Sequence, residues 1–263
     1  DAMATTPVDT IETALVTGAG RGIGRAIAKE LAKSGRFVYL NYHSNEMCAR
    51  QTLDQIKELG GEGSLLQFDV RDQDAAETAV KKILSEKEKI DILVNNAGIV
   101  DSGPITEFSE AAWDRIFAVN TKGIFLMSKA AIPHLLVADN ASIVNTASIA
   151  GKKGVSNMAA YCGSKFAAIG ITQSMAQELA LDKIRVNAIC PGIVGTAMWL
   201  DHLIPKNTAD NAAPVDFATQ TQQLIPMGVA QTAQDMADAV LYLARANNVT
   251  GIALTVAGGM EMN

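Results

Sequence analysis

The chain has 263 residues, of which 48% are apolar and 19% are charged. This composition is typical of a globular protein with a sizeable core and excludes an intrinsically disordered chain. At roughly 150 residues per domain the length allows one or two domains. No linker or internal repeat is evident, so we expect one domain over 13–263 after an N-terminal extension, 1–12. Asp1 and Ala2 precede Met3 and are expected to be a cloning remnant.

The charge balance argues against nucleic acid and membranes as partners. Lys and Arg total 22 and Asp and Glu total 28, which gives a net charge of −6 and no basic run. There is no apolar run of about 18 residues and no signal-peptide core, so we expect a soluble, cytoplasmic protein. The scattered cysteines and histidines predict neither a disulfide framework nor a metal site; they are Cys48, Cys162, Cys190, His43, His134 and His202.

Short apolar runs alternate with segments of helical periodicity along the whole chain. Strands are predicted at 14–17, 37–40, 64–68, 92–94, 142–145, 185–189 and 253–256. Helices are predicted at 22–34, 46–59, 73–86, 110–137, 161–181 and 232–245, the last with a capping-box pattern from Thr232 to Asp235. This alternation, with continuously apolar strands, predicts an α/β fold: a single doubly wound, Rossmann-like parallel sheet with helices on both faces.

One segment, 197–228, breaks the alternation. It contains Pro205, Pro214 and Pro226 and few apolar residues at regular spacing. Long irregular segments inside a compact domain are usually functional. We therefore interpret this segment as a substrate lid that precedes the last helix.

A glycine-rich turn follows the first predicted strand and opens the first predicted helix. Glycines let the backbone approach a pyrophosphate, and the helix N-terminus offers free N–H groups to it. The predicted strand before this turn and the predicted helix after it favour dinucleotide binding, and a plain tight turn is the alternative. The expected contacts are Gly18, Gly20, Arg21, Gly22, Ile23 and Gly24.

The second predicted strand ends without the carboxylate that would bind the ribose 2′-OH of NAD. Leu40 is followed by Asn41, Tyr42 and His43, while Arg21 lies in the glycine turn. An arginine with neutral donors suits a 2′-phosphate, which a carboxylate would repel. We therefore predict NADP (NADPH) rather than NAD, with contacts from these residues. In the alternative, Arg21 is only a surface residue and Asn41 accepts either cofactor.

Tyr161 and Lys165 are four residues apart, so a helix places them on one face. A lysine near a phenol favours the phenolate, which lowers the pKa of the tyrosine from about 10 and makes it a general acid/base. Ser148, at the end of a strand, can bind the same carbonyl oxygen. Taken alone, the tyrosine and lysine would be a surface pair.

At this point the sequence resembles the short-chain dehydrogenase/reductase family over about residues 13–259. The resemblance rests on several motifs in order: Thr17-Gly-x-x-x-Gly22-x-Gly24, Asn95-Asn96-Ala97-Gly98, Asn120, Ser148, Tyr161-x-x-x-Lys165 and Pro191-Gly192. It implies an enzyme in which Tyr161 transfers the proton and Ser148 polarises the carbonyl. Lys165 would hold the nicotinamide ribose, and Asn120 would keep a water for proton relay.

The same resemblance implies further cofactor contacts. Asp69 and Val70 would border the adenine. The cleft would be lined by Asn96, Ala97 and Gly98, and the nicotinamide would be covered by Pro191, Gly192, Ile193, Val194 and Thr196. The family's usual assembly implies a homodimer or homotetramer.

Two local resemblances point to different classes of substrate. Met198 and Trp199 look like the pair beside the substrate in acetoin/diacetyl reductases and sorbitol-type polyol dehydrogenases, whereas 41–46 look more like 3-oxoacyl-[acyl-carrier-protein] reductases. An acidic carrier protein needs a basic docking patch, and 134–141 and 173–183 are nearly devoid of cations. We therefore expect a small ketone, diketone or polyol substrate. A carrier-protein thioester and a non-catalytic dinucleotide sensor are the alternatives.

Overall fold

The structure is a computed structural model, and it describes residues 11–196, 198 and 217–262. The strands are β1 (Thr13–Val16), β2 (Phe37–Tyr42), β3 (Glu62–Gln67), β4 (Ile92–Asn95), β5 (Ser142–Thr146), β6 (Arg185–Pro191) and β7 (Ala253–Val256). The helices are α1 (Gly22–Lys33), α2 (Glu46–Glu58), α3 (Gln73–Lys87), α4 (Glu110–Phe117), α5 (Gly123–Leu135), α6 (Ala159–Glu178), α8 (Phe217–Leu224) and α9 (Ala233–Arg245). Every predicted strand and helix is present, with small differences at the ends.

Two differences from the sequence prediction matter. The helix predicted over 110–137 is divided into α4, a π-helical turn η1 (Ala118–Lys122), and α5. The segment interpreted as a lid contains the helix α8, while 197 and 199–216 lie outside the described residues. A short 3₁₀ turn, η2 (Ile149–Gly151), follows β5.

All seven strands run parallel, in the order β3-β2-β1-β4-β5-β6-β7. The chain moves outward from β1 to β3 and then crosses back to β4, which pairs with the other side of β1. Val16, the last residue of β1, is aligned with both Leu40 of β2 and Val94 of β4, so the three strands end on the same side of the sheet within two residues of one another. Such a reversal of strand order opens a crevice at the carboxyl ends of the strands.

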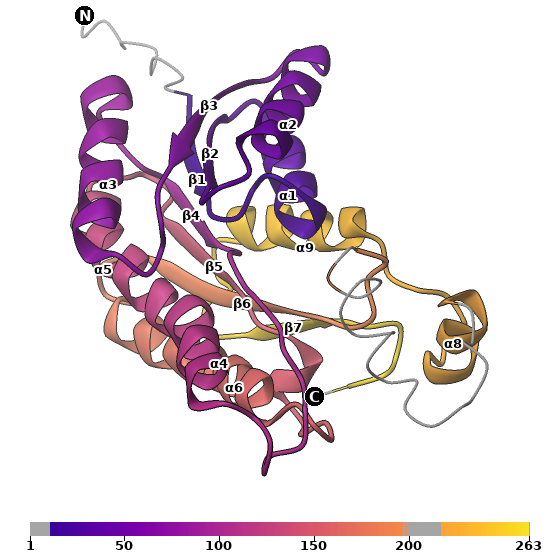
Figure 1. Ribbon diagram of the computed structural model, residues 1–263. Helices are drawn as coiled ribbons and strands as arrows, with labels where there is room; N and C mark the ends of the chain where they lie inside the picture. The colour runs from indigo at the N-terminus through magenta and orange to yellow at the C-terminus, as the bar shows by residue number, and fades with distance from the viewer. Residues whose placement is uncertain (1–10, 197, 199–216, 263) are drawn as a thin grey trace, which may run out of the picture.

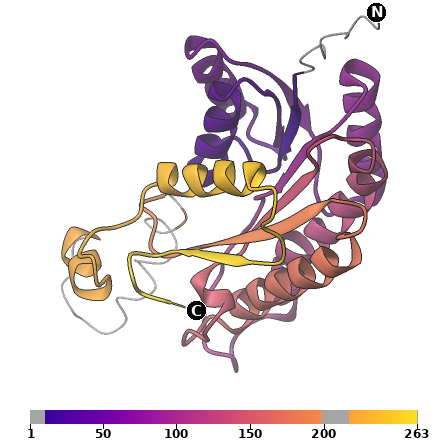
Figure 2. The ribbon, with the colours of Figure 1, turned by 180° about the vertical axis from the view of Figure 1, so that it is seen from behind.

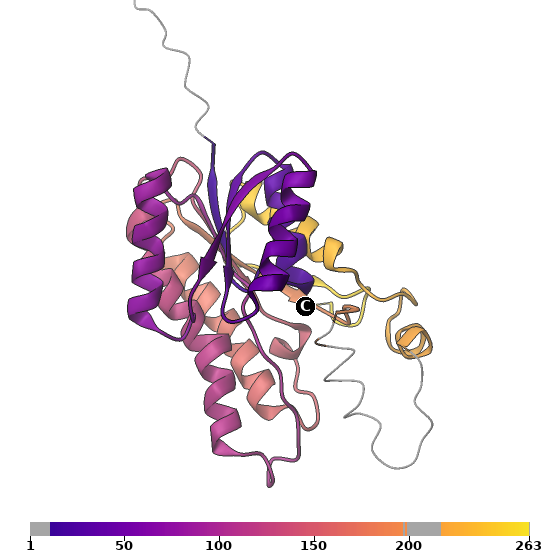
Figure 3. The same ribbon diagram turned by 45° about the horizontal axis from the view of Figure 1, so that its top comes forward.

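The helices cover both faces of the sheet, as the three views in Figures 1, 2 and 3 show. On one face α1 and α9 pack together, and Ile27 and Leu31 join Val240 and Leu243 in one buried cluster. On the other face α3, α5 and α6 contribute to a second cluster. The sheet is therefore buried on both faces, which explains why its strands are continuously apolar.

Four of the helices named above begin with a polar cap. Asn45, Asp72, Ser109 and Thr232 each accept a backbone N–H in the first turn of α2, α3, α4 and α9. The predicted capping box of α9 is confirmed, because Asp235 also accepts the N–H of Thr232 at 2.6 Å. Each of these four helices also has an acidic residue in its first turn, where the helix dipole favours negative charge.

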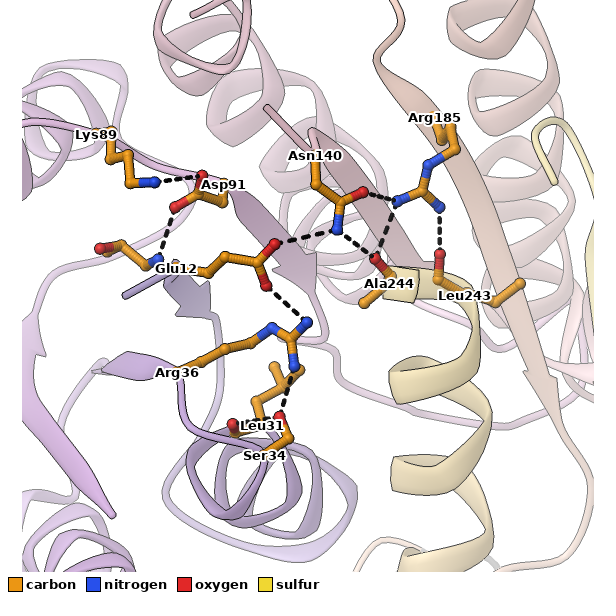
Figure 4. A network of polar contacts seen from close by, with 11 residues as sticks. Glu12, Leu31, Ser34, Arg36, Lys89, Asp91, Asn140, Arg185, Leu243 and Ala244 are labelled. Carbon is orange, nitrogen blue, oxygen red and sulfur yellow. Dashed lines mark hydrogen bonds and ion pairs between the residues drawn. The ribbon is translucent and has the colours of Figure 1, made fainter. Parts of the chain in front are cut away.

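A polar network lies at the opposite end of the strands from the crevice, where the strands begin (Figure 4). Arg36, before β2, forms a 2.6 Å ion pair with Glu12, whose carboxylate also accepts from Asn140. Arg185, at the start of β6, donates to Asn140 and to the α9 carbonyls of Leu243, Ala244 and Ala246. Because Arg185 is buried and satisfies carbonyls that α9 cannot pair itself, it fixes α9 to the sheet.

We predict that Arg185→Leu lowers the free energy of unfolding by about 3 kcal/mol, because several buried acceptors lose their donor. Denaturation in urea measures the change. Arg50→Ala is the control: Arg50 pairs with Glu46 on the exposed face of α2, and its loss should cost less than about 0.5 kcal/mol. Equal costs for the two variants would contradict the role given to Arg185.

Candidate active site

A cleft of about 810 Å³ lies at the carboxyl ends of the strands. The predicted site residues that line it are Gly18, Arg21, Gly22, Ile23, Gly24, Asn41, His43, Asp69, Val70, Asn96, Ala97, Gly98, Ser148, Tyr161, Lys165, Pro191, Gly192, Ile193, Val194, Thr196 and Met198. Three other predicted residues, Gly20, Tyr42 and Asn120, are described by the structure but do not line this cleft. Trp199 lies outside the described residues.

The glycine turn between β1 and α1 needs its glycines for two physical reasons. Gly18 and Gly22 have φ angles of +63° and +54°, in the left-handed region that side chains disfavour. Gly24 packs directly on the turn, and a Cβ there would lie 2.2 Å from the carbonyl oxygen of Gly18. The turn can therefore close only with glycine at position 24.

The N-terminus of α1 differs from those of the capped helices. Its N-cap is Arg21, which makes no capping hydrogen bond with its side chain, and the first turn contains no acidic residue. Arg21, Gly22, Ile23 and Gly24 all line the cleft. The first N–H groups of the helix and the positive end of its dipole are thus available to an anion in the cleft.

Side chains behind the turn hold it in place. Thr17 accepts the N–H groups of Asn96 and Ala97 at 2.9 and 3.0 Å, and Asn96 donates to the carbonyls of Thr17 and Gly18. Asn41 accepts the N–H of Gly18 at 3.1 Å and donates to the carbonyl of Phe68 at 3.0 Å. The Asn41 amide is thus directed into the fold, so its part in the site is to brace the turn between β1, β2 and β3.

Gly20 and Tyr42, the two remaining residues near this end, do not line the cleft. The Gly20 carbonyl accepts from Arg25 at 2.7 Å and from Thr52 at 3.2 Å, which ties the turn to α2. Tyr42 is 9% exposed at the end of β2. Their expected direct contacts with a cofactor are not visible in this geometry.

The end of the cleft beyond β2 and β3 carries several charged and polar groups. Arg71 forms hydrogen bonds with both carboxylate oxygens of Asp69, at 2.6–3.0 Å, and His43 lies 3.5 Å from the same carboxylate. Arg71 is the main cause that lowers the pKa of Asp69. Arg21 and Ser44 also line this end. Sequence reasoning had not singled out Ser44 or Arg71.

The opposite end of the cleft brings Ser148, Tyr161 and Lys165 together. Ser148 follows β5 and caps η2 by accepting the N–H of Ala150 at 3.1 Å. Tyr161 and Lys165 lie one turn apart on α6, and the ammonium Nζ lies 5.6 Å from the centre of the phenol ring. Lys165 is 4% exposed and donates to the carbonyl of Thr146 at 2.8 Å. The predicted helical spacing therefore places the three side chains in one cleft.

The pKa of Tyr161 differs from the sequence expectation. Burial raises it to about 12, although a hydrogen bond with Ser148 acts in the opposite direction. Burial also lowers the pKa of Lys165, to about 8. In this geometry desolvation of the phenol outweighs any stabilisation of the phenolate by the lysine, because the ammonium group donates to Thr146 instead.

Asn120 lies in the π-helical turn η1 and holds the substrate side of the site together. Its amide oxygen accepts the N–H of Ile99 at 2.8 Å, and its nitrogen donates to the carbonyl of Ile99 and to Ser164. Ser164 donates in turn to the carbonyl of Tyr161 at 2.7 Å. The side chain is 1% exposed and close to Lys165, since a Cβ at Gly98 would be within 3.5 Å of both.

Several lining residues were not predicted. Those near the catalytic end are mostly apolar, together with Arg115 from α4 and Lys153 from the turn after η2. They are Ile99, Arg115, Val119, Ile149, Lys153, Val155, Met158, Leu224 and Met260. They come from five stretches of the chain, at 99, 115–119, 149–158, 224 and 260, so no local pattern in the sequence could group them.

Among the described residues, no three His, Cys, Asp or Glu side chains are grouped closely enough to hold a metal ion. None of the helices in the described ranges is long and apolar enough to cross a membrane.

Comparison with known proteins places this geometry in a family. The family model described as short chain dehydrogenase matches residues 12–203. The chain is 34% identical over 253 residues to the 3-oxoacyl-[acyl-carrier-protein] reductase FabG of Staphylococcus aureus, with 95% of this chain and 98% of that protein covered. The protein therefore belongs to the short-chain dehydrogenase family and is an oxidoreductase of that family.

Solved structures agree with this assignment. An actinorhodin polyketide ketoreductase with NADPH matches with a TM-score of 0.89 and 33% identity over 95% of this chain and 97% of that one. Carveol dehydrogenase from Mycobacterium avium in complex with NAD matches with a TM-score of 0.87 and 32% identity over the same shares. The predicted Rossmann-like fold and family resemblance are confirmed.

We predict that Gly24→Ala weakens binding of NADPH at least about tenfold, because the added Cβ would overlap the Gly18 carbonyl and displace the turn. Titration of NADPH fluorescence measures the affinity. Gly170→Ala is the matched control: Gly170 lies in α6, where a Cβ would meet open space, and alanine should stabilise the helix by up to about 1 kcal/mol. Unchanged affinity in Gly24→Ala would show that the turn does not bind the dinucleotide.

Proposed function

We propose that this protein interconverts a ketone and a secondary alcohol by hydride transfer with NADP(H). The observation that carries the proposal is the meeting of Ser148, Tyr161 and Lys165 in one cleft with the uncapped N-terminus of α1. A cleft with an anion site at one end and a buried acid/base at the other suits a dinucleotide and a carbonyl compound. A protein that only senses a dinucleotide would not require the buried acid/base group at the second end of the cleft.

The residues present fit a dinucleotide. The glycine turn has room for a phosphate because Gly22 and Gly18 present backbone rather than side chains, and the first N–H groups of α1 are uncapped. When bound, the cofactor supplies or accepts the hydride. Of the chain's own residues, those of 191–196 line the cleft on the side of β6.

Each catalytic side chain has a distinct task in this proposal. Tyr161 donates the proton to the carbonyl oxygen during reduction, and Ser148 donates a hydrogen bond to the same oxygen. Lys165 provides positive charge beside the phenol, since its pKa of about 8 leaves it mainly protonated at neutral pH. Asn120 acts by fixing the loop at Ile99 and the backbone of Tyr161. Of the segment 197–228, the described residues Met198 and Leu224 line the cleft.

We predict that Tyr161→Phe abolishes carbonyl reduction, with kcat falling at least about a hundredfold, because the proton donor is lost. Consumption of NADPH measures the rate, and NADPH fluorescence measures binding, which should change less than about threefold. Tyr242→Phe is the control, since Tyr242 is exposed on α9. If binding fell as much as turnover, the phenol would have a structural role instead.

The preference for NADP rests on the groups beyond β2 and β3. Among the described residues, Arg21 is exposed and has no carboxylate partner, whereas Arg71 is paired with Asp69. The Ser44 hydroxyl, a neutral donor, and His43 line the same cleft. An unpaired guanidinium and neutral donors favour a ribose 2′-phosphate over a 2′-hydroxyl.

We predict that Arg21→Ala raises the Kd of NADPH about tenfold and leaves that of NADH within about twofold, because only the former carries the 2′-phosphate. Fluorescence titration of both cofactors gives the ratio. Lys33→Ala, at the other end of α1, keeps the helix and removes an equal charge. If Arg21→Ala weakened both cofactors equally, the 2′-phosphate assignment would be wrong.

For the substrate, we propose a small ketone or diketone first. The apolar residues at the catalytic end suit a hydrocarbon body better than a polyol. Leu136 and Val137 follow α5, and Leu181 and Asp182 follow α6. Apart from Lys183, these stretches lack the cations that a carrier protein would need. Initial rates with diacetyl and with an acetoacetyl thioester separate this from the second candidate, a 3-oxoacyl-[acyl-carrier-protein] reductase, which the curated relatives favour.

We also propose a homo-oligomer in the cytoplasm. Phe125 on α5 and Phe166 on α6 are about half exposed on the same side of the sheet. Exposed aromatic side chains are enriched at interfaces between subunits. Light scattering would give the number of subunits.

A further inference from the structure

Two cationic side chains stand at the catalytic end of the cleft, and the proposed reaction does not use them. Arg115 lies on α4, five residues before Asn120, and Lys153 follows η2, five residues after Ser148. Both line the cleft, and their side chains are 50% and 51% exposed. They therefore belong to the elements that carry the reacting groups and still face solvent.

Backbone contacts join the two segments. The N–H of Gly103, in the loop after β4, donates to the carbonyl of Asn157, in the loop before α6, at 2.8 Å. Asp101 in the first loop contacts Arg115, and Lys153 leads into the second loop. The two cations thus belong to neighbouring segments that both line the cleft, which are called its rim below.

The acidic partners of these cations leave room for another anion. Asp101 lies 3.6 Å from the Arg115 guanidinium, which is an ion-pair distance but too long for a hydrogen bond. Lys153 contacts Glu261 at 3.1 Å and the carbonyl of Met260 at 3.0 Å. A guanidinium offers five N–H donors, so Arg115 can bind a second carboxylate or a phosphate without losing Asp101.

The charge of the cleft also opposes that of the whole chain. The described lining residues include five cationic side chains, from Arg and Lys, and one carboxylate, that of Asp69, although the chain carries −6. In addition, α6 begins beside Met158 with neither a side-chain cap nor an acidic residue in its first turn. The local potential at this end therefore favours an anion.

Apolar side chains also line this end of the cleft. Ile149, Val155, Met158 and Met260 line it together with Lys153. A substrate that fits would have its carbonyl at Tyr161, a hydrocarbon portion along these side chains and a charged group at the rim. A purely neutral ketone would form no ion pair with Arg115 or Lys153.

We propose that the substrate bears an anionic group, a carboxylate or a phosphate, which binds to Arg115 and Lys153. This inference rests on the proposed carbonyl reduction and narrows its substrate class to anionic ketones. Arg115 and Lys153 are specificity-determining residues, and Asp101 competes with the anion for Arg115.

The test compares two pairs of ketones, each with one anionic and one neutral member: the first pair differs in a terminal carboxylate, and the second in the phosphate-bearing part of CoA. One pair is 5-oxohexanoate and its methyl ester; the other is acetoacetyl-CoA and acetoacetyl-N-acetylcysteamine. We expect kcat/KM with NADPH to be at least about tenfold higher for the anionic member of at least one pair. The pair that shows the preference distinguishes a carboxylate from a phosphate. A wild-type enzyme that reduces both members of both pairs equally well would overturn the inference but not the proposed function.

Substitutions of the two cations and of Asp101 should change the anionic-to-neutral ratio of kcat/KM in opposite directions. Arg115→Gln and Lys153→Gln should each lower the anionic-to-neutral ratio at least about fivefold, whereas Asp101→Asn should raise it. Lys57→Gln on the outer face of α2 is the charge-matched control and should leave the ratio unchanged. If the Arg115 and Lys153 variants reduced the rates of both members equally, a structural role would explain them and the inference would fail.

If the enzyme reduces neither ketone of a pair, the inference is tested by measuring binding instead. The Tyr161→Phe protein with bound NADPH is titrated with each acid and its ester, and the change in NADPH fluorescence gives the two Kd values. Tighter binding of the anion that is lost in Tyr161→Phe/Lys153→Gln supports the anion site even if the proposed reaction fails. Equal binding of acid and ester overturns it.

Discussion

The parallel direction of all seven strands is the constraint on which the rest of the structure depends. Because every strand ends at the same edge, the glycine turn after β1, Ser148 after β5 and the segment after β6 meet in one cleft. The reversal of strand order between β1 and β4 opens that edge. The opposite edge, where the strands begin, carries the buried network of Glu12, Arg36 and Arg185. The polar network that stabilises the fold and the cleft with the candidate catalytic residues thus lie at opposite ends of the same strands.

Neutral polar side chains between the sheet and its helices keep the site in register. Asn95 donates to Asn145 at 2.9 Å, and Asn145 donates to Thr172 of α6 at 2.9 Å. This chain links β4 and β5 to the helix that carries Tyr161 and Lys165. Buried amides that are hydrogen-bonded in series are costly to disturb, because any break leaves a desolvated group without a partner. Movement of α6 relative to Ser148 is therefore resisted from within the core.

The sequence predicted the elements well and the charges of the site less well. Continuous apolar strands and local caps such as Thr232 are signals within a few residues, so they could be read directly. The π-helical turn at Asn120 could not, because it is held by Ile99 and Ser164 from distant segments. The same limit applies to the pKa of Tyr161: the four-residue spacing indicated Lys165 as a neighbour, but burial depends on the whole fold and raises that pKa.

The net charge of the chain and the charge of the residues that line the cleft have opposite signs. The difference lies in the positions of the acidic residues. The acidic residues in the first turns of α2 and α3, Glu46 and Asp74, do not line the cleft, although Ser44 and Arg71 just before these helices do. The helices α1 and α6 also begin at the cleft, and their first turns contain no acidic residue. Their dipoles and the cations of the lining then act together on whatever enters. A chain with a net charge of −6 can thus hold a cleft suited to anions at both ends. The net charge argues against a large polyanionic partner over the outer surface, but it does not describe the potential that a small ligand meets inside.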